Sequence, residues 1–198
     1  MKKIIQNSLL GMMMFLAGIP AFTDEAPSMV KNPSFEIINQ ITGLPESWST
    51  LIRQGKDKNA NCQFSVSRKA QDGNSAVAIS VPDQEKTGAL AEFCQFVSVK
   101  PRTKYYFAVY METPAYVNAW PCAVAEERTS DKGYPKYSTP SSHQALSAEK
   151  VIPDQYQLFE TAFTTGADTF FINVSLRLQN LGSGSVQFDN VILLEQPE

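Results

Sequence analysis

The stretch Phe170-Phe171-Ile172-Asn173-Val174-Ser175-Leu176-Arg177-Leu178 decides the fold class. From Phe170 onward every second residue is apolar, whereas Asn173, Ser175 and Arg177 occupy the alternate positions. Successive side chains of a strand point to opposite faces, so this pattern is typical of a strand with one face in a core. We predict a half-buried β-strand here.

Similar alternating runs recur along the chain, each bounded by turn residues, and no run of helical pattern reaches ten residues. The predicted strands are 35–39, 63–68, 75–81, 92–99, 105–112, 118–126, 156–165, 170–178 and 186–194. A single open sheet of nine strands would leave one apolar face in water, so two packed sheets are expected. We predict an all-β jelly-roll β-sandwich of two antiparallel sheets. Residues 128–149 are expected to form one long irregular loop, either functional or disordered.

The first 23 residues have the pattern of a signal peptide. Lys2 and Lys3 precede an apolar run from Leu9 to Ile19, which Pro20-Ala21-Phe22-Thr23 follows with small residues for cleavage. The apolar run is about half of the ~20 residues that a membrane span requires. We therefore predict a bacterial chain that is secreted, periplasmic or on the cell surface, without membrane insertion after cleavage. Residues 24–198 are expected to form one domain; an uncleaved N-terminal anchor is the alternative.

Charge and motifs exclude several function classes. The chain has 17 basic and 20 acidic residues, and loss of Lys2 and Lys3 leaves 15 basic residues and a net charge of −5. No basic stripe remains for binding nucleic acid. His143 is the only histidine, and no Gly-x-Ser-x-Gly motif accompanies it. Glu126 and Glu127 would point to opposite faces of a strand, so they cannot flank one glycosidic bond; we expect a solvated strand end. We predict that the chain is not an enzyme.

A series of short motifs extends over the whole chain after the signal peptide. They are Asn32-Pro33-Ser34-Phe35-Glu36, Leu44-Pro45-Glu46-Ser47-Trp48, Asp72-Gly73-Asn74-Ser75, Val97-Ser98-Val99-Lys100-Pro101 and Gly182 to Val191. In this order they resemble the carbohydrate-binding modules of families four and nine, in the galactose-binding-like jelly-roll superfamily. The resemblance implies sugar binding on a concave face or at loop tips, and a structural role for Trp48 at the edge of the sandwich.

The resemblance also implies a structural calcium ion. Its ligands would be the side chains of Glu36 and Asp189, with backbone carbonyls around Gly73 and Asn74. Calcium takes six to eight hard oxygen ligands and accepts carbonyls among them. The alternative is that both acids cap turns or lie solvated at strand ends.

Sugar rings stack on aromatic side chains, and their hydroxyls need polar partners. The register of the family puts Tyr105, Phe107, Val109 and Met111 in the core and leaves alternate residues on the concave face, with Glu92, Cys94 and Phe96 facing outward by the same parity. The candidate ligand-binding residues are Tyr106, Tyr110, Tyr116, Asn118, Trp120, Tyr134 and Tyr137. The alternative for the two strand tyrosines is ordinary cross-strand packing.

The predicted function is a secreted, non-catalytic carbohydrate-binding protein that recognises a poly- or oligosaccharide through an aromatic-lined face. The alternative is a structural or adhesion β-sandwich with a protein or cell-surface partner. Cys62, Cys94 and Cys122 allow one bridge in an oxidising compartment. Strand parity favours a bridge between Cys94 and Cys122 and leaves Cys62 as a buried thiol.

Overall fold

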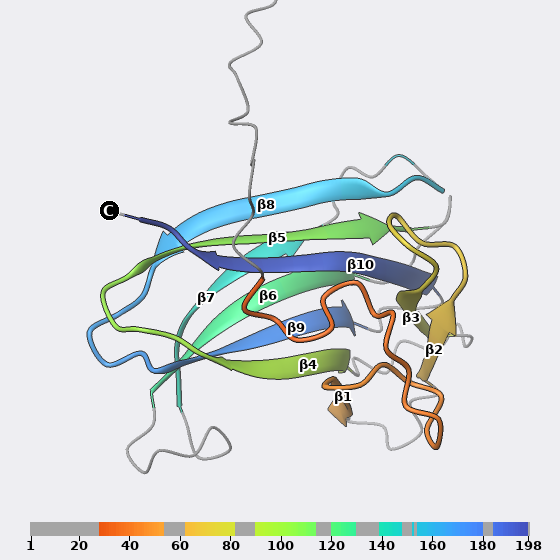
Figure 1. Cartoon of the computed structure of the whole chain (residues 1–198), viewed down its shortest axis with the longest axis horizontal. Coiled ribbons are helices and arrows are strands. Elements are labelled where there is room, and N and C mark those ends of the chain that lie inside the picture. The colour runs from red at the N-terminus through yellow and green to blue at the C-terminus, as the bar shows by residue number, and fades with distance from the viewer. Residues whose placement is uncertain are drawn as a thin grey trace, which may run out of the picture.

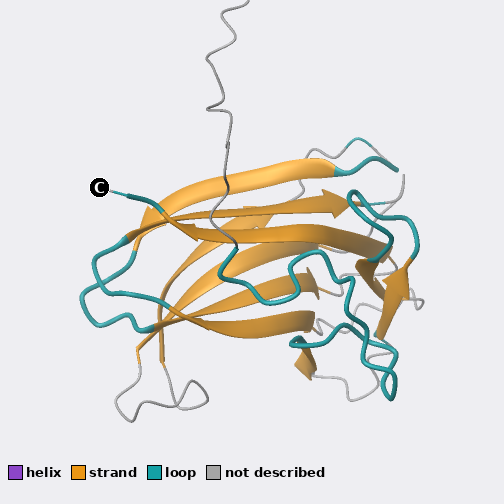
Figure 2. Ribbon diagram, in the orientation of Figure 1, coloured by secondary structure: helices purple, strands orange, loops and turns teal. Residues whose placement is uncertain are grey.

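The structure is a computed structural model that describes residues 28–53, 62–81, 90–113, 120–129, 139–147, 152, 154–179 and 184–197. Figure 2 shows that the described part consists of strands and loops. Among these residues no helix is long and apolar enough to cross a membrane. The predicted signal peptide, residues 1–23, lies outside the described residues.

Ten strands form two five-stranded sheets (Figure 1). The strands are β1 Ser49–Arg53, β2 Gln63–Ser67, β3 Ala76–Val81, β4 Leu90–Ser98, β5 Lys104–Glu112, β6 Trp120–Thr129, β7 Thr139–Ser147, β8 Gln157–Thr164, β9 Phe171–Gln179 and β10 Gly184–Glu195. One sheet has the order β1-β4-β9-β6-β7 and the other β2-β3-β10-β5-β8. Every pairing between these strands is antiparallel. The predicted fold class is confirmed.

Two predicted segments need correction, and one strand was not predicted. Residues 35–39 form no strand; Phe35 has a positive φ of 59°, and Ile38 makes only an isolated bridge to Pro45. Strand β1 was not predicted, and β7 lies inside the stretch expected to be a loop. Both are edge strands, each paired along one side only, and neither carries a clean apolar alternation. Pairing with β4 and β6 thus gives them a strand conformation that their own sequences do not indicate.

The core lies between the two sheets. On β9, Ile172, Val174, Leu176 and Leu178 are completely buried, as the alternation predicts. The residues of β5 that the family register placed in the core, Tyr105, Phe107, Val109 and Met111, are completely buried too. Side chains alternate along a strand, so the polar residues of β9 face away from this core. Strand β9 is the middle strand of its sheet.

The segment before β1 runs along β10, as Figure 1 shows. The N–H of Met29 donates to the carbonyl of Leu193 at 2.9 Å, and the N–H of Val191 donates to the carbonyl of Pro33 at 2.9 Å. The segment 28–33 and β10, which are distant in sequence, therefore lie side by side. Further along, Trp48 packs on the buried Phe35 with ring centroids 5.2 Å apart, which confirms a structural role for this tryptophan.

The loop 71–75, which precedes β3, is fixed by two carboxylates distant in sequence. Glu36 Oε1 accepts hydrogen bonds from the N–H groups of Asn74 at 2.8 Å and Ser75 at 2.9 Å. Asp189 Oδ2 accepts from the N–H groups of Gln71 at 2.7 Å and Asp72 at 3.0 Å. We call this arrangement the carboxylate staple. It joins the N-terminal segment and β10 to the same loop.

The staple predicts different costs for two alanine substitutions at glycines of similar backbone conformation. Gly73 has φ +66° and Gly43 has φ +69°, so either alanine costs about 1–2 kcal/mol of backbone strain. At Gly43 an added Cβ meets nothing within 4 Å, whereas at Gly73 it would overlap Glu36 Oε1 and lie 2.9 Å from Glu36 Cδ. Gly73→Ala should therefore lower the free energy of unfolding by about 1–3 kcal/mol more than Gly43→Ala, because it displaces a bonded carboxylate. Urea denaturation measures both; equal losses would contradict the staple.

Candidate functional site

The outer face of the sheet β1-β4-β9-β6-β7, on the side away from the core, carries an unusual set of polar side chains. Residues directly opposite one another on antiparallel strands share a face. One row across the sheet contains Leu51, Glu92 and Arg177; the row two residues along contains Ser49, Cys94, Ser175 and Val124; and a third contains Phe96, Asn173 and Glu126. We call this surface the β9 outer face.

Two arginines and two glutamates form an ion network on the β9 outer face. Arg177 Nε donates to Glu92 Oε2 at 2.8 Å, and Arg177 Nη2 lies 3.6 Å from Glu126 Oε2. Arg128 pairs with the same oxygen of Glu126, and the hydroxyl of Ser175 donates to Glu92. Glu92 is completely buried, and the side chains of Arg128 and Arg177 are only 12% and 13% exposed. The network is neutral overall and fixed in position, since each charge has a partner of opposite sign.

Asn173 carries a buried acceptor with no partner. Its side chain is 2% exposed, and its Nδ2 lies 3.5 Å from Glu126 Oε2, which identifies the nitrogen of the amide. The other amide atom, Oδ1, is buried and accepts no hydrogen bond from any residue that the structure describes. Buried polar groups are almost always hydrogen-bonded, so an unpaired one indicates an unseen water or ligand donor. Asn173 Oδ1 is thus a candidate acceptor for a ligand hydroxyl.

An exposed aromatic ring lies beside this acceptor. Phe96 is opposite Asn173 in the register of β4 and β9, and it is 43% exposed. The ring also contributes to a surface pocket of about 320 Å³ at the β1–β4 side of the face, lined by Lys31, Ser47, Ser49, Cys94, Gln95 and Phe96. Gln95 holds one wall in place, because its amide bonds the N–H and carbonyl of Lys31 and the carbonyl of Ser47. An apolar ring, a polar pocket and an unpaired acceptor therefore lie together.

The structure separates the predicted ligand-binding residues. The backbone of Trp120 lies opposite Gln179 at the end of β6, in register with the β9 outer face, but its side chain lies outside what the structure describes. The predicted Tyr116, Asn118, Tyr134 and Tyr137 also lie outside the described residues.

Tyr106 and Tyr110 require a correction. Both lie on β5, in the sheet β2-β3-β10-β5-β8, and not in the sheet that carries Phe96 and Trp120. Strand parity indicates which side of its own sheet a residue faces, but it does not indicate which sheet contains the strand. The Tyr106 hydroxyl donates to Glu160 on the neighbouring β8, and burial together with this bond raises the pKa of Tyr106. This contact is the cross-strand packing that the alternative interpretation expected.

The expectation for Glu126 and Glu127 was half right. They do face opposite sides of β6, since Glu126 joins the outer ion network while Glu127 Oε2 accepts from the N–H of Gly166 at 2.8 Å and the hydroxyl of Thr169 at 2.6 Å. The solvated strand end is wrong, because Glu127 is 5% exposed and its carboxylate binds the loop before β9. The signal that could have revealed the outer network was the polar alternation of Asn173, Ser175 and Arg177 in a central strand.

The predicted cysteine bridge is also wrong. Cys94 on β4 and Cys122 on β6 are separated by β9, so their Cα atoms are about two strand spacings, or ~9.6 Å, apart. A disulfide needs Cα atoms within about 7 Å. Cys62 is half-buried, packs against the core and has no disulfide, and burial raises the pKa of its thiol.

The residues predicted to bind calcium do not fit a shared ion in this arrangement. Glu36 and Asp189 do approach the loop around Gly73 and Asn74, but the loop presents N–H donors to them. Both oxygens of Asp189 and one of Glu36 accept backbone N–H bonds, since Asp189 Oδ1 accepts from Asn190 at 2.7 Å. No group of three or more His, Cys, Asp or Glu side chains placed to hold a metal occurs among the residues described. Burial raises the pKa of the Asp189 carboxyl, against the opposing effect of its N–H donors.

Comparison with known proteins identifies the fold. No protein-family model and no curated protein matches this sequence. A family 61 carbohydrate-binding module in complex with β-1,4-galactotriose is similar with a TM-score of 0.55 at 17% identity, covering 86% of this chain and 100% of the module. A family 4 module is similar with a TM-score of 0.52 at 17% identity, covering 84% of this chain and 99% of the module.

A third similar structure is the enzymatically active domain of tailspike protein 4 of bacteriophage CBA120. It has a TM-score of 0.63 at 13% identity over 85% of this chain, but this chain covers only 21% of that domain's chain. At these identities the comparisons establish the fold and extend no further. The chain has the β-sandwich fold of carbohydrate-binding modules.

The ion network predicts a non-additive pair of substitutions. Glu92→Leu leaves a buried Arg177 charge without one of its partners and should lower the free energy of unfolding by about 3–5 kcal/mol. Adding Arg177→Met should restore much of that loss, since apolar residues then fill the site and Glu126 keeps Arg128. Urea denaturation of both single variants and the double variant measures the coupling. Additive losses would show that Glu92 and Arg177 contribute independently.

The backbone N–H groups that bind Glu36 and Asp189 lead to a test for calcium at the carboxylate staple. If N–H donors alone satisfy Glu36 and Asp189, a chelator should leave the melting temperature of the protein unchanged. Asp189→Ala should then lower the melting temperature equally with and without chelator. A fall in melting temperature on chelation that Asp189→Ala abolishes would instead support the calcium ion that the sequence predicted, because a bound ion stabilises the folded state.

Proposed function

We propose that this chain is a secreted, non-catalytic carbohydrate-binding protein that holds a polysaccharide or oligosaccharide on the β9 outer face. The observation that carries the proposal is the pairing of Phe96 with Asn173. An exposed ring offers a stacking surface for the C–H face of a sugar, and the buried Oδ1 one step across the sheet offers an acceptor for a hydroxyl. The similar modules of families 61 and 4 support this reading of the fold.

The ion network supports recognition rather than catalysis. A hydrolytic pair needs one carboxylic acid and one carboxylate directed at the same bond. On the β9 outer face the carboxylates of Glu92 and Glu126 both contact arginines, and Glu92 is completely buried. These groups hold Asn173 and its neighbours in position, and preorganised polar groups bind a ligand without further ordering cost.

The proposal includes the pocket of about 320 Å³ at the β1–β4 side. A ring stacked on Phe96 would place neighbouring hydroxyls over the serines of this pocket, Ser47 and Ser49. Because such a site hydrogen-bonds hydroxyls, it should discriminate against analogues that lack them. Stacking and neutral hydrogen bonds depend little on ionic strength, so binding should persist in moderate salt.

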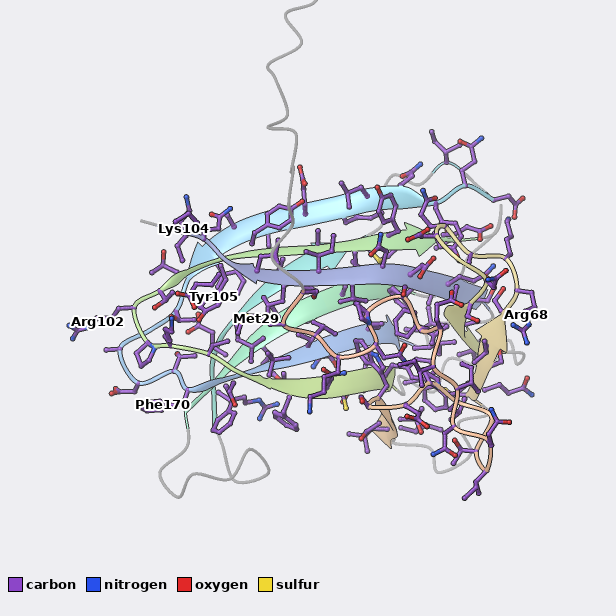
Figure 3. All side chains as sticks on the ribbon, viewed as in Figure 1. Met29, Arg68, Arg102, Lys104, Tyr105 and Phe170 are labelled. Carbon is purple, nitrogen blue, oxygen red and sulfur yellow. The ribbon has the colours of Figure 1, made fainter. Side chains whose placement is uncertain are left out.

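The test compares two phenylalanines of similar exposure. Phe96→Ala should weaken retention on polysaccharide by at least about tenfold, which corresponds to 1.4 kcal/mol. Phe170→Ala is the matched control, since Phe170 is 48% exposed and lies at the end of the sandwich (Figure 3), before β9 begins. Affinity electrophoresis through gels containing β-1,4-galactan, xylan or a soluble β-glucan measures the retention.

The same gels provide a second variant. Asn173→Ala should reduce retention on the polysaccharide that the protein binds, and raising the salt concentration should have little effect on the unmodified protein. Retention on none of the polysaccharides, or equal losses from Phe96→Ala and Phe170→Ala, would overturn the assignment of the face.

A further inference from the structure

A second polar pocket lies apart from the β9 outer face, beside the carboxylate staple. Its volume is about 610 Å³, and its lining residues are Glu36, Ile38, Gln40, Arg68, Asn74 and Ser75. Figure 3 shows Arg68 at the end of the sandwich opposite Arg102 and Lys104. None of these residues belongs to the sheet that carries Phe96 and Asn173, since they lie in the loops before β1 and between β2 and β3. A volume of this size is within the range of small-ligand sites.

The floor of the pocket is fixed. Glu36 Oε1 is held by the N–H groups of Asn74 and Ser75, and Ser75 is 2% exposed. Asp189 fixes the preceding residues of the same loop through Gln71 and Asp72. A ligand that enters the pocket therefore meets a carboxylate whose position is set before binding.

The walls carry polar groups with unused hydrogen-bonding capacity. Arg68 is exposed and makes no hydrogen bond or ion pair with any residue that the structure describes. Its guanidinium offers five N–H donors. The Gln40 amide makes only a local contact of 3.4 Å to the carbonyl of Ile38, and Asn74 contributes to the staple through its backbone. Among the lining residues that the structure describes, Ile38 is the one with an apolar side chain.

The presence of both Arg68 and Glu36 in one pocket favours a ligand without net charge. An anion that approached Arg68 would also meet the Glu36 carboxylate, and a cation that approached Glu36 would meet the guanidinium. A neutral molecule with several hydroxyls suits both, because each hydroxyl accepts from the guanidinium or donates to the carboxylate. The side-chain amides of Gln40 and Asn74 can both donate and accept hydrogen bonds. We propose that this pocket is a second carbohydrate-binding site, which takes one uncharged sugar residue through hydrogen bonds.

The two sites differ in how they bind. No aromatic ring is among the described residues that line the second pocket, so these residues offer no surface for stacking on the flat side of a polymer. A terminal residue exposes more hydroxyls than a residue within a chain, which makes the end of an oligosaccharide the better fit. This second site rests on the proposed function for its ligand class, since both sites would bind carbohydrate. It shares no residue with the β9 outer face, so an experiment can disprove one site and leave the other standing.

The experiment titrates the mature protein with galactose, glucose, xylose and mannose and follows the Arg Nε–Hε signals by ¹⁵N NMR. At least one sugar should shift the Arg68 signal with saturation in the millimolar range. Arg68→Gln should weaken binding of that sugar, measured by saturation-transfer NMR, by about tenfold or more, since a hydrogen bond from a charged donor contributes about 1.5–3 kcal/mol. Arg102→Gln is the matched control, because Arg102 is also exposed and lies at the opposite end.

A Phe96→Ala variant separates this site from the outer face. It should leave the Arg68 response unchanged while retention on polysaccharide falls. Absence of any Arg68 shift with all four sugars would overturn the second site, and so would equal weakening by Arg68→Gln and Arg102→Gln. Loss of the Arg68 response in Phe96→Ala would also overturn it, because that result would place the sugar on a single site.

Discussion

The structure depends on the burial of β9 on both of its sides. One side consists of apolar residues that form the core, and the other carries Ser175, Asn173 and Arg177, which have almost no access to water. Burying a polar group costs free energy unless the group is hydrogen-bonded. Glu92 on β4 and Glu126 on β6 satisfy Arg177 from the two neighbouring strands. The ion network thus connects the three central strands β4, β9 and β6, in addition to the backbone hydrogen bonds between them.

The carboxylate staple solves a different problem at another place. Strand β10 is bordered by β3 along its first half and by the segment 28–33 along its second half, with a register irregularity between Asp189 and Ile192. Asn190 has a positive φ of 50° at this irregularity. Asp189 has no exposed surface there, and three backbone N–H groups donate hydrogen bonds to its buried carboxylate. These bonds offset the cost of removing the carboxylate from water. The staple holds the loop 71–75 against this irregular part of β10. The same loop forms the floor of the second pocket.

The sequence predicted the parts of the fold that follow from local alternation. Strands β9 and β5 were recognisable because their core-facing residues repeat every two positions, and these residues are completely buried from Ile172 to Leu178 and from Tyr105 to Met111. The short strand β1 and the polar strand β7 were missed, since their conformation comes from pairing with β4 and β6 and not from an apolar alternation of their own. Tyr106 and Tyr110 were assigned to the wrong outer face for the same reason: alternation identifies a side of a strand, whereas sheet membership depends on pairing. The polar alternation of β9 indicates a polar side, but the partners of Arg177 follow only from the register of three strands. The pocket at Arg68 needs two loops brought together by the staple.

The arrangement of Asn173 links stability to recognition. Its Nδ2 faces Glu126, which is itself held by Arg128 and Arg177, so the orientation of the amide follows from the same contacts that stabilise the sheet. The buried Oδ1, which has no hydrogen-bond partner among the described residues, is therefore held in one orientation, and Phe96 lies opposite Asn173 on β4. At the second pocket only the floor is fixed by the fold, while Arg68 and Gln40 are exposed side chains. Ordering such side chains costs about 0.5–1.5 kcal/mol each on binding, so the outer face should be the tighter of the two sites and the Arg68 pocket the weaker one.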